Sequence, residues 1–184
     1  CDDVDAVARF AAAVGAVTYE FENVPVVAAE AAAAHCPVYP PPQALRSTQD
    51  RLVEKDFIAG LGIPVAPYRG VEDAAGLAAA IAALGLPAHL KARRFGYDGK
   101  GQARLEGASI IDAAFAAIGA VPAILESHIA FAAEVSVIGV RGRDGAFAVY
   151  DVPENTHADG ILRRSVVPSR LPGPIEQRAK EMTR

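Results

Sequence analysis

The stretch from Lys91 to Gln102, KARRFGYDGKGQ, combines three glycines within six residues with four cations and a single acid. It follows the apolar run PAHL at residues 87–90, which is typical of a strand. Glycines at 96, 99 and 101 allow positive φ and let backbone N–H groups approach an anion, while the lysines and arginines supply positive charge. The composition favours either a hairpin tip that clamps a phosphate or an exposed turn, and both remain open here.

Both standard nucleotide fingerprints are missing from this stretch. Its glycines are ordered G-x-x-G-x-G, whereas the dinucleotide fingerprint is G-x-G-x-x-G. Lys100 is followed by Gly101, whereas the lysine of a P-loop is followed by Ser or Thr. Any phosphate site here therefore belongs to another kind of nucleotide-binding fold.

The flanking sequence predicts helices and strands in a mixed arrangement. Helical spacing and capping residues predict helices, and short apolar or alternating runs predict strands. The predicted helices are 48–59, 73–84, 109–118 and 174–184. The predicted strands are 87–91, 102–105, 122–126, 134–140, 146–150 and 161–168, with a turn at 143–145. Residues 91–102 would then form the tip of a hairpin in an α+β domain with several hairpins.

A different pattern precedes residue 40. The sequence predicts a helix at 2–14, a strand at 16–21, a helix at 26–35 and a short strand at 38–39, the order expected of a parallel sheet. The prolines at 40–42 disfavour a continuous helix and mark a boundary. We therefore predict two domains, at residues 1–43 and 44–184.

Composition limits the functional classes. With 18 basic and 22 acidic residues the net charge is −4, which argues against a general nucleic-acid binder. The sequence contains no apolar run of about 18 residues and no signal-peptide pattern, so we expect a cytoplasmic protein without membrane partners. Cys1 and Cys36 lack metal-ligand spacing, and we expect no metal ligands among these residues.

Three further polar features are candidates for a ligand site. Glu126 ends a predicted strand, Glu134 follows eight residues later, and His157 lies in the polar segment ENTH at 154–157. An acid at a strand end, followed by an irregular link, is a plausible adenine-binding hinge, because exposed backbone groups can pair with the base edge. The alternative, solvated acids and a loop histidine, stays open on residue chemistry alone.

Five phrases in order resemble an ATP-grasp family, the 5-(carboxyamino)imidazole ribonucleotide synthases of purine biosynthesis. They are VTYEFENVP (17–25), QDRLVEKDFIAGLGIPVAPY (49–68), GYDGKGQ (96–102), AAEVSVIGVRGRDG (132–145) and ENTHADGILRRSVVP (154–168). The resemblance implies an α/β fold of the α+β ATP-grasp type, preceded by part of a parallel-sheet domain. It also implies that ATP and bicarbonate give carboxyphosphate, which carboxylates aminoimidazole ribonucleotide.

The resemblance also assigns roles to residues. It implies that Arg51 and Lys91 contact ATP phosphates and that residues 96–102 form a mobile lid, in which Asp98 and Lys100 act with Lys91 in catalysis. Tyr97 and Asp98 would also approach the imidazole substrate. The remaining ATP-site positions implied are Gly96, Gly99, Gly101, Gln102, Glu126, Ser127, His128, Ile129, Glu134 and His157.

The chain also departs from the family pattern. Phe95 stands where some relatives have a further glycine. The chain starts at Cys1 rather than Met, and the family's first glycine-rich loop would precede it. The acidic Mg²⁺ ligands would follow Arg184, so we expect an internal fragment, inactive alone, of a protein that is a homodimer. Another ATP-grasp carboxylase or ligase, or a non-catalytic nucleotide-binding module, remains an alternative.

Overall fold

The computed structural model describes residues 3–96, 100–107, 111–158 and 160–184, which form two compact units. The first unit comprises the described residues up to Gly96 and those from Gly101 to His128. The second comprises Lys100 and the described residues from Ile129 onwards. The predicted boundary between residues 43 and 44 lies inside the first unit and stays a prediction.

The N-terminal part of the first unit is a small α/β layer. It contains α1 (Val4–Ala11), β1 (Val17–Thr18), α2 (Val26–Ala33) and β2 (Val38–Tyr39). β1 and β2 pair in parallel, with Val17 opposite Val38, which confirms the predicted pattern. Small side chains let the helices approach closely, since Ala11 and Ala32 are buried together with Val38.

The segment that follows differs from the prediction in two ways. Pro42 begins a helix, α3 (Pro42–Thr48), because proline at the first helical position lacks only an N–H that would have no partner there. The next helix, α4, spans Arg51–Gly60 and so begins three residues later than predicted. Asp50 caps it by accepting from the N–H groups of Leu52 and Val53. Ser47, which with Asp50 has the spacing of a capping box, lies inside α3 and does not cap α4.

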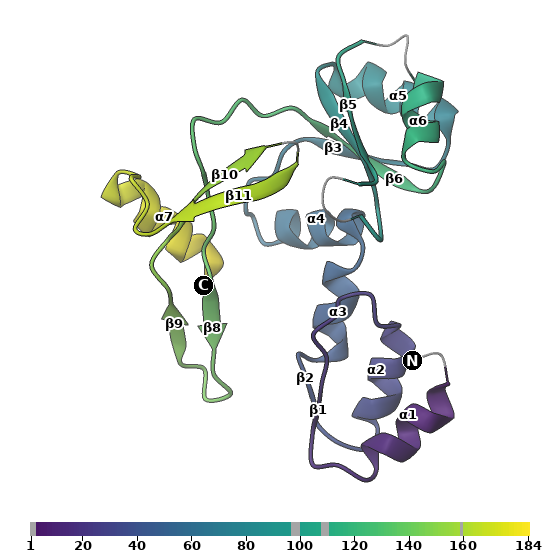
Figure 1. Cartoon of the computed structure of the whole chain (residues 1–184), viewed down its shortest axis with the longest axis vertical. Helices are drawn as coiled ribbons and strands as arrows, with labels where there is room; N and C mark the ends of the chain where they lie inside the picture. The colour runs from purple at the N-terminus through teal and green to yellow at the C-terminus, as the bar shows by residue number, and fades with distance from the viewer. Residues whose placement is uncertain (1–2, 97–99, 108–110, 159) are drawn as a thin grey trace. The chain divides into compact units, whose positions relative to one another are not determined.

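A four-stranded antiparallel sheet forms the centre of the first unit. Its order is β3–β6–β4–β5, from β3 (Tyr68–Val71), β6 (Ala123–Ser127), β4 (Ala88–Ala92) and β5 (Gln102–Leu105). The sequence did not predict β3, whose four residues include a glycine. Helices α5 (Ala74–Leu84) and α6 (Ile111–Ala117) lie beside this sheet (Figure 1).

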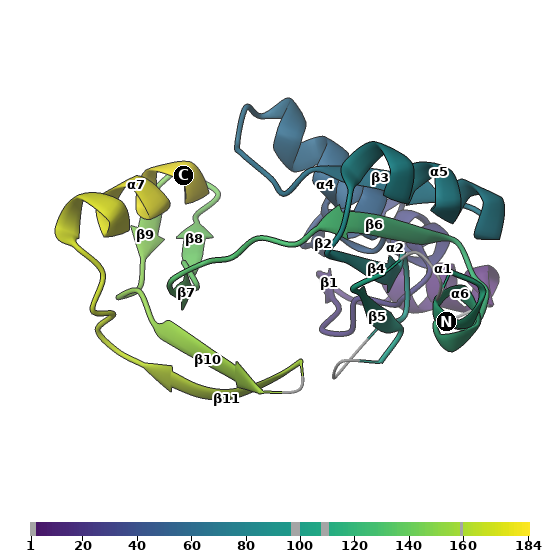
Figure 2. The ribbon, with the colours of Figure 1, turned by 90° about the horizontal axis from the view of Figure 1, so that it is seen from above.

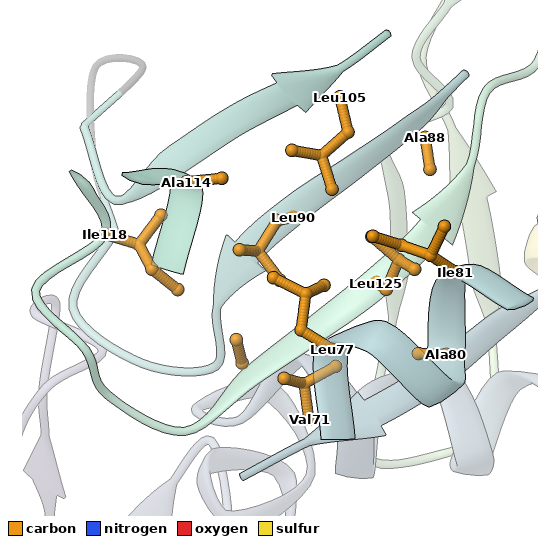
Figure 3. Close-up of a cluster of buried hydrophobic side chains, with 11 residues drawn as sticks. Val71, Leu77, Ala80, Ile81, Ala88, Leu90, Leu105, Ala114, Ile118 and Leu125 are labelled. Atoms are coloured by element: carbon orange, nitrogen blue, oxygen red, sulfur yellow. The ribbon is translucent and has the colours of Figure 1, made fainter. Parts of the chain in front are cut away.

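One face of the sheet is apolar and packed against these two helices. Leu77 and Ile81 of α5 point toward Leu90, Leu105 and Leu125 of the strands (Figure 3). β4 shows the strict alternation behind this arrangement, since Ala88, Leu90 and Ala92 are buried while His89 and Lys91 are only half-buried. The core therefore fixes which side chains reach the opposite face.

Helix α4 lies on that opposite face, over β3 and β6. A Cβ atom added to Gly70 of β3 would lie 3.0 Å from Leu52 Cδ2 of α4, so the glycine allows this close approach. The Tyr68 hydroxyl donates a 2.6 Å hydrogen bond to Asp56 and also joins α4 to β3. The remainder of this face, on β4 and β5, carries polar side chains.

The second unit is mostly β-structure. Its strands are β7 (Glu134–Val135), β8 (Gly139–Arg141), β9 (Phe147–Val149), β10 (Glu154–Ala158) and β11 (Ile161–Val166), followed by α7 (Gly173–Thr183). β11, β10 and β7 form one sheet, while β8 and β9 form a separate hairpin (Figure 2). The predicted strand 134–140 is therefore wrong as one strand, because β7 and β8 belong to different sheets. No helix among the described residues is long and apolar enough to cross a bilayer.

Candidate functional site

The open face of the sheet brings together side chains that lie far apart in the sequence. Residues directly opposite each other in neighbouring strands share a face of the sheet. Glu126 lies opposite Tyr68 on one side and His89 on the other, and Lys91 lies opposite Gln102. The alternation that buries Leu90 and Leu125 therefore turns His89, Lys91 and Glu126 to the polar face.

Glu126 is the centre of a charge cluster on this face. One of its oxygens, Oε2, accepts a 2.7 Å hydrogen bond from Lys91 Nζ, and Oε1 lies 3.5 Å from Lys55 Nζ of α4. The Glu126 side chain is 10% exposed, so both contacts act in a partly desolvated place. Burial by itself would raise the pKa of Glu126, but the hydrogen bond from Lys91 and the charges of both lysines outweigh it and lower that pKa.

Two of the predicted site residues, Lys91 and Glu126, thus meet in the structure, and Lys55 joins them. The sequence analysis missed Lys55. It lies four residues after Arg51, on the same side of α4, and this spacing is the signal that could have identified it. A nucleotide phosphate that approached Lys91 or Lys55 would compete with the Glu126 carboxylate for the same ammonium groups.

Arg93, another cation of the stretch, is occupied by structural contacts. Its Nε donates to Asp50 Oδ1 at 2.9 Å, and its guanidinium also contacts Glu72 at 3.1 Å. Its backbone carbonyl accepts from the Arg51 N–H at 3.0 Å, which attaches the start of α4 to the end of β4. Hydrogen bonding to Asp50 raises the pKa of Arg93. Arg93 therefore positions Arg51 and is not a free anion contact.

A polar cavity of about 490 Å³ lies beside this attachment. Arg51 and Arg94 line it together with the carboxylates of Glu22 and Glu54, and Gly96 lies at its edge. Burial raises the pKa of the Glu54 carboxyl, and the nearby positive charge of Arg51 opposes this shift without cancelling it. The predicted phosphate contact Arg51 therefore faces a cavity that offers both guanidinium donors and carboxylate acceptors.

The base of the glycine-rich hairpin has the geometry that its sequence requires. Gly101 has φ +68°, and a Cβ there would lie 3.4 Å from the Ala92 side chain, so glycine fits best. The Ala92 N–H donates to the Gly101 carbonyl at 2.7 Å, and Gln102 lies opposite Lys91. Lys100 is exposed. Tyr97, Asp98 and Gly99 lie outside the described residues.

Phe95 departs from ordinary backbone geometry at the start of this hairpin. Its φ is +62°, a left-handed conformation that costs a residue with a side chain about 1–2 kcal/mol. The ring is 67% exposed, with the Arg94 guanidinium 5.6 Å from its centroid. A glycine would adopt this conformation without that cost.

The predicted hinge follows directly after Glu126. The Ser127 N–H donates to the Pro67 carbonyl at 2.9 Å and the His128 N–H donates to the Pro87 carbonyl at 3.0 Å, so both donors are used where β6 ends. His128 also contacts His89 through a 3.0 Å bond between ring nitrogens. Burial and the positive charge of Lys91 lower the pKa of His89, which favours a neutral ring in this pair. Ile129 begins the second unit and is half exposed.

Within the second unit, two more predicted residues meet. Glu134 of β7 lies opposite Asn155 of β10, and its Oε2 lies 3.2 Å from His157 Nδ1. His157 follows an irregularity in the pairing of β10 with β11, and the predicted polar segment 154–157 forms part of a strand. This pair belongs to a different unit from the cluster around Glu126.

Comparison with known proteins assigns both parts of the chain. Residues 1–49 match the ribonucleotide synthetase preATP-grasp domain, and residues 56–184 match the ATP-grasp domain. The N5-carboxyaminoimidazole ribonucleotide synthase of Brucella melitensis biotype 1 is 52% identical over 172 residues, which is 92% of this chain and 48% of that protein. The chain thus spans about half the length of the curated relatives it matches.

Solved structures of such proteins have the same fold. An N5-carboxyaminoimidazole ribonucleotide synthetase in complex with ADP superposes with a TM-score of 0.92 and 38% identity, covering 99% of this chain and 48% of its own. The Aspergillus clavatus synthase with ADP and 5-aminoimidazole ribonucleotide gives a TM-score of 0.88 and 28% identity, covering 98% of this chain and 47% of its own. The ATP-grasp domain model matches residues 56–184, well over half of this chain, and the chain therefore belongs to the ATP-grasp family.

Proposed function

We propose that the protein containing this chain carboxylates 5-aminoimidazole ribonucleotide with ATP and bicarbonate. Bicarbonate attacks the γ-phosphorus and displaces ADP to give carboxyphosphate. The ribonucleotide amine then takes the carboxyl group, with release of phosphate and a proton. The observation that carries the proposal is the 52% identity to an N5-carboxyaminoimidazole ribonucleotide synthase, which runs through 92% of the chain.

Lys91 and Arg51 are the residues that we assign to the ATP phosphates. Lys91 would exchange its 2.7 Å bond to Glu126 for a phosphate oxygen, and Lys55 would remain to neutralise the carboxylate. Arg51 faces the polar cavity and is held there through the backbone bond to Arg93. Fixed cations of this kind stabilise the charge that develops on a transferred phosphoryl group.

The family resemblance assigns the adenine and the ribose of ATP to two further groups of residues. The N–H groups of Ser127 and His128 already bond the carbonyls of Pro67 and Pro87, so the base edge would meet the remaining backbone groups of residues 126–129. Glu134 would accept from the ribose hydroxyls, with His157 beside it. The 3.2 Å contact between Glu134 and His157 supports a shared role. The ADP bound by a solved relative of 38% identity supports nucleotide binding by this chain.

Several parts of the proposal rest on family resemblance. Among the described residues, no group of three or more His, Cys, Asp and Glu side chains fits a metal ion. Mg²⁺ stays a proposed cofactor. The roles of Tyr97, Asp98, Gly99 and Lys100 in lid closure and catalysis also stay predictions, as do the homodimer and a cytoplasmic location. The Aspergillus clavatus complex with 5-aminoimidazole ribonucleotide supports the choice of substrate.

The test is substrate-dependent turnover by the full-length protein. ADP release and incorporation of labelled bicarbonate would be measured with and without 5-aminoimidazole ribonucleotide. We expect both signals to require the ribonucleotide and to fall at least about 100-fold in Lys91→Ala, the loss that removal of one transition-state contact typically causes. Lys180→Ala is the matched control, because Lys180 forms a 2.6 Å ion pair with Glu176 within α7, a helix to which no part of the site is assigned. Turnover that does not depend on the ribonucleotide would indicate that the protein is another ATP-grasp ligase.

A further inference from the structure

Gln49 is a buried amide whose hydrogen-bonding groups reach two separate segments. It is 7% exposed and lies between α3 and the cap of α4. Its Nε2 donates to the backbone carbonyls of Glu22 and Val24, and its Oε1 accepts from Arg94 at 2.7 Å. The amide thus uses both N–H donors on the loop at 20–25 and its oxygen on Arg94, in the glycine-rich hairpin.

The residues after Gln49 strengthen its attachment to the hairpin. Asp50 pairs with Arg93, and the Arg51 N–H donates to the Arg93 carbonyl at 3.0 Å. Residues 49–51 are therefore joined to residues 93–94 by three consecutive contacts, at the point where the chain enters the glycine-rich hairpin. Through Gln49 this attachment extends to the loop at 20–25.

The two segments that Gln49 joins both line ligand-sized space. A cavity of about 620 Å³ is lined by residues 20–23 of the loop and by Phe95 and Gly96 of the hairpin. The polar cavity of about 490 Å³ shares Glu22, Phe95 and Gly96 with it. Loop and hairpin are therefore walls of adjoining cavities, and a shift of one wall against the other would change both.

We propose that Gln49 is a positioning residue that couples the loop at 20–25 to the glycine-rich hairpin. A ligand seated against the loop fixes, through the amide, Arg94 and with it the start of the hairpin. This inference rests on the proposed function, in which a ribonucleotide and ATP bind the same protein. A side chain in this place needs two donors and one acceptor, which a glutamine supplies and a glutamate does not.

Gln49→Glu separates the bonds that Gln49 donates to the loop from the bond that it accepts from the hairpin. The carboxylate retains the shape and can still accept from Arg94, but it cannot donate to the carbonyls of Glu22 and Val24. Gln49→Asn is a second variant, which keeps the amide group on a side chain that is shorter by one methylene. Gln43→Glu is the matched control, because Gln43 is an exposed glutamine of α3 whose amide bonds only the neighbouring Ser47, among the described residues, at 3.5 Å.

Coupling is measured as the ratio of the ADP dissociation constants of full-length protein without and with 5-aminoimidazole ribonucleotide. Coupled sites typically show ratios of about 5–150. We expect the ratio to lie in this range for wild type and Gln43→Glu and to fall close to one for Gln49→Glu. The ADP affinity of Gln49→Glu without the ribonucleotide should change by a smaller factor than the ratio does. A variant that loses ADP affinity but keeps the ratio, or a wild type that binds both ligands without coupling, would overturn the proposal.

Hydrogen exchange of the ligand-free full-length protein tests the link independently of the proposed function. In Gln49→Glu, peptides covering residues 20–25 and 91–102 should exchange faster together, while Gln43→Glu leaves both unchanged. Faster exchange in the loop alone would overturn the coupling even in an active enzyme. If the wild type ignores the ribonucleotide, the proposed function fails, and the exchange result still decides the role of Gln49.

Discussion

Lys91, Lys55 and Glu126 form a cluster with two positive charges and one negative charge on a partly buried face. Before any ligand is bound, the Glu126 carboxylate offsets the electrostatic repulsion between the two ammonium groups. An incoming phosphate can replace it at Lys91 without leaving a buried cation unpaired. At the scale of single residues, the site is therefore set up for an anion and stabilised in its absence.

The lowered pKa of Glu126 has a consequence for stability. Because the folded pKa lies below the unfolded value of about 4.3, Glu126 contributes stability above that pH, and the contribution is lost as the pH falls through the folded pKa. Glu126→Gln should therefore destabilise the full-length protein at pH 7, and the difference from wild type should shrink below about pH 4.

Denaturant unfolding at several pH values checks this expectation. Glu106→Gln is the control, because its ion pair with Arg104 is largely exposed and should change stability at neutral pH by less than about 1 kcal/mol. A difference between Glu126→Gln and wild type that grows on acidification would contradict the assignment of the charge cluster.

Sequence alone identified part of this cluster. Lys91 was predicted as a cation of the glycine-rich stretch and from the family resemblance, and Glu126 as an acid that ends a strand. Lys55 was missed because its contact with Glu126 depends on the packing of α4 across the sheet, which Gly70 permits and no local pattern reveals. The same holds for Arg93, which was expected to contribute charge to an anion clamp and instead pairs with Asp50.

At the scale of elements, the attachment of α4 to β4 determines the geometry of the site. Asp50 caps α4 and pairs with Arg93, so one carboxylate both starts the helix and holds it to the strand. Local signals predicted the helix but placed its start at Thr48. Ser47 and Asp50 have the spacing of a capping box, but α3 incorporates Ser47, so Asp50 itself becomes the cap.

Asp50→Ala should cost more stability than an ordinary cap deletion. Loss of a cap costs about 1 kcal/mol, and Arg93 would also lose its main partner in a place where its side chain is only 22% exposed. Asp73→Ala is the matched control, because Asp73 caps α5 through the Gly76 N–H and has no ion pair among the described contacts. Thermal unfolding of both full-length variants gives the comparison, and equal losses would show that the pair with Arg93 adds nothing.

Elements with strong local patterns were predicted more successfully than those that depend on partners. The hairpin of β8 and β9, the strand β5 and the helix α5 were confirmed, each with a turn, glycine or cap at its end. β3 was not predicted because its residues YRGV alternate weakly, and the strand is defined by its pairing with β6. The 134–140 run was divided because its two ends pair with different strands.

At the scale of the molecule, the chain divides where the predicted hinge lies, between His128 and Ile129. The charge cluster lies in the first unit, and the pair of Glu134 and His157 lies in the second. Sequence motifs predicted the ATP-grasp family, and the family match confirms it. The same motifs predicted Lys91, Glu126, Glu134 and His157 as ATP-site residues, and these roles stay predictions. The division between the units was not predicted at this position, because it depends on contact density rather than on any local signal.

The measurement that tests the central claim most directly is ADP binding to full-length protein by titration calorimetry, compared among wild type, Lys91→Ala and Lys180→Ala. Charged hydrogen bonds contribute about 1.5–3 kcal/mol, so Lys91→Ala should weaken binding by at least about tenfold. Lys180→Ala, which removes a 2.6 Å ion pair within α7 in place of the 2.7 Å pair of Lys91, should bind as wild type does. Equal affinities in all three proteins would contradict the assignment of this sheet face as the nucleotide site.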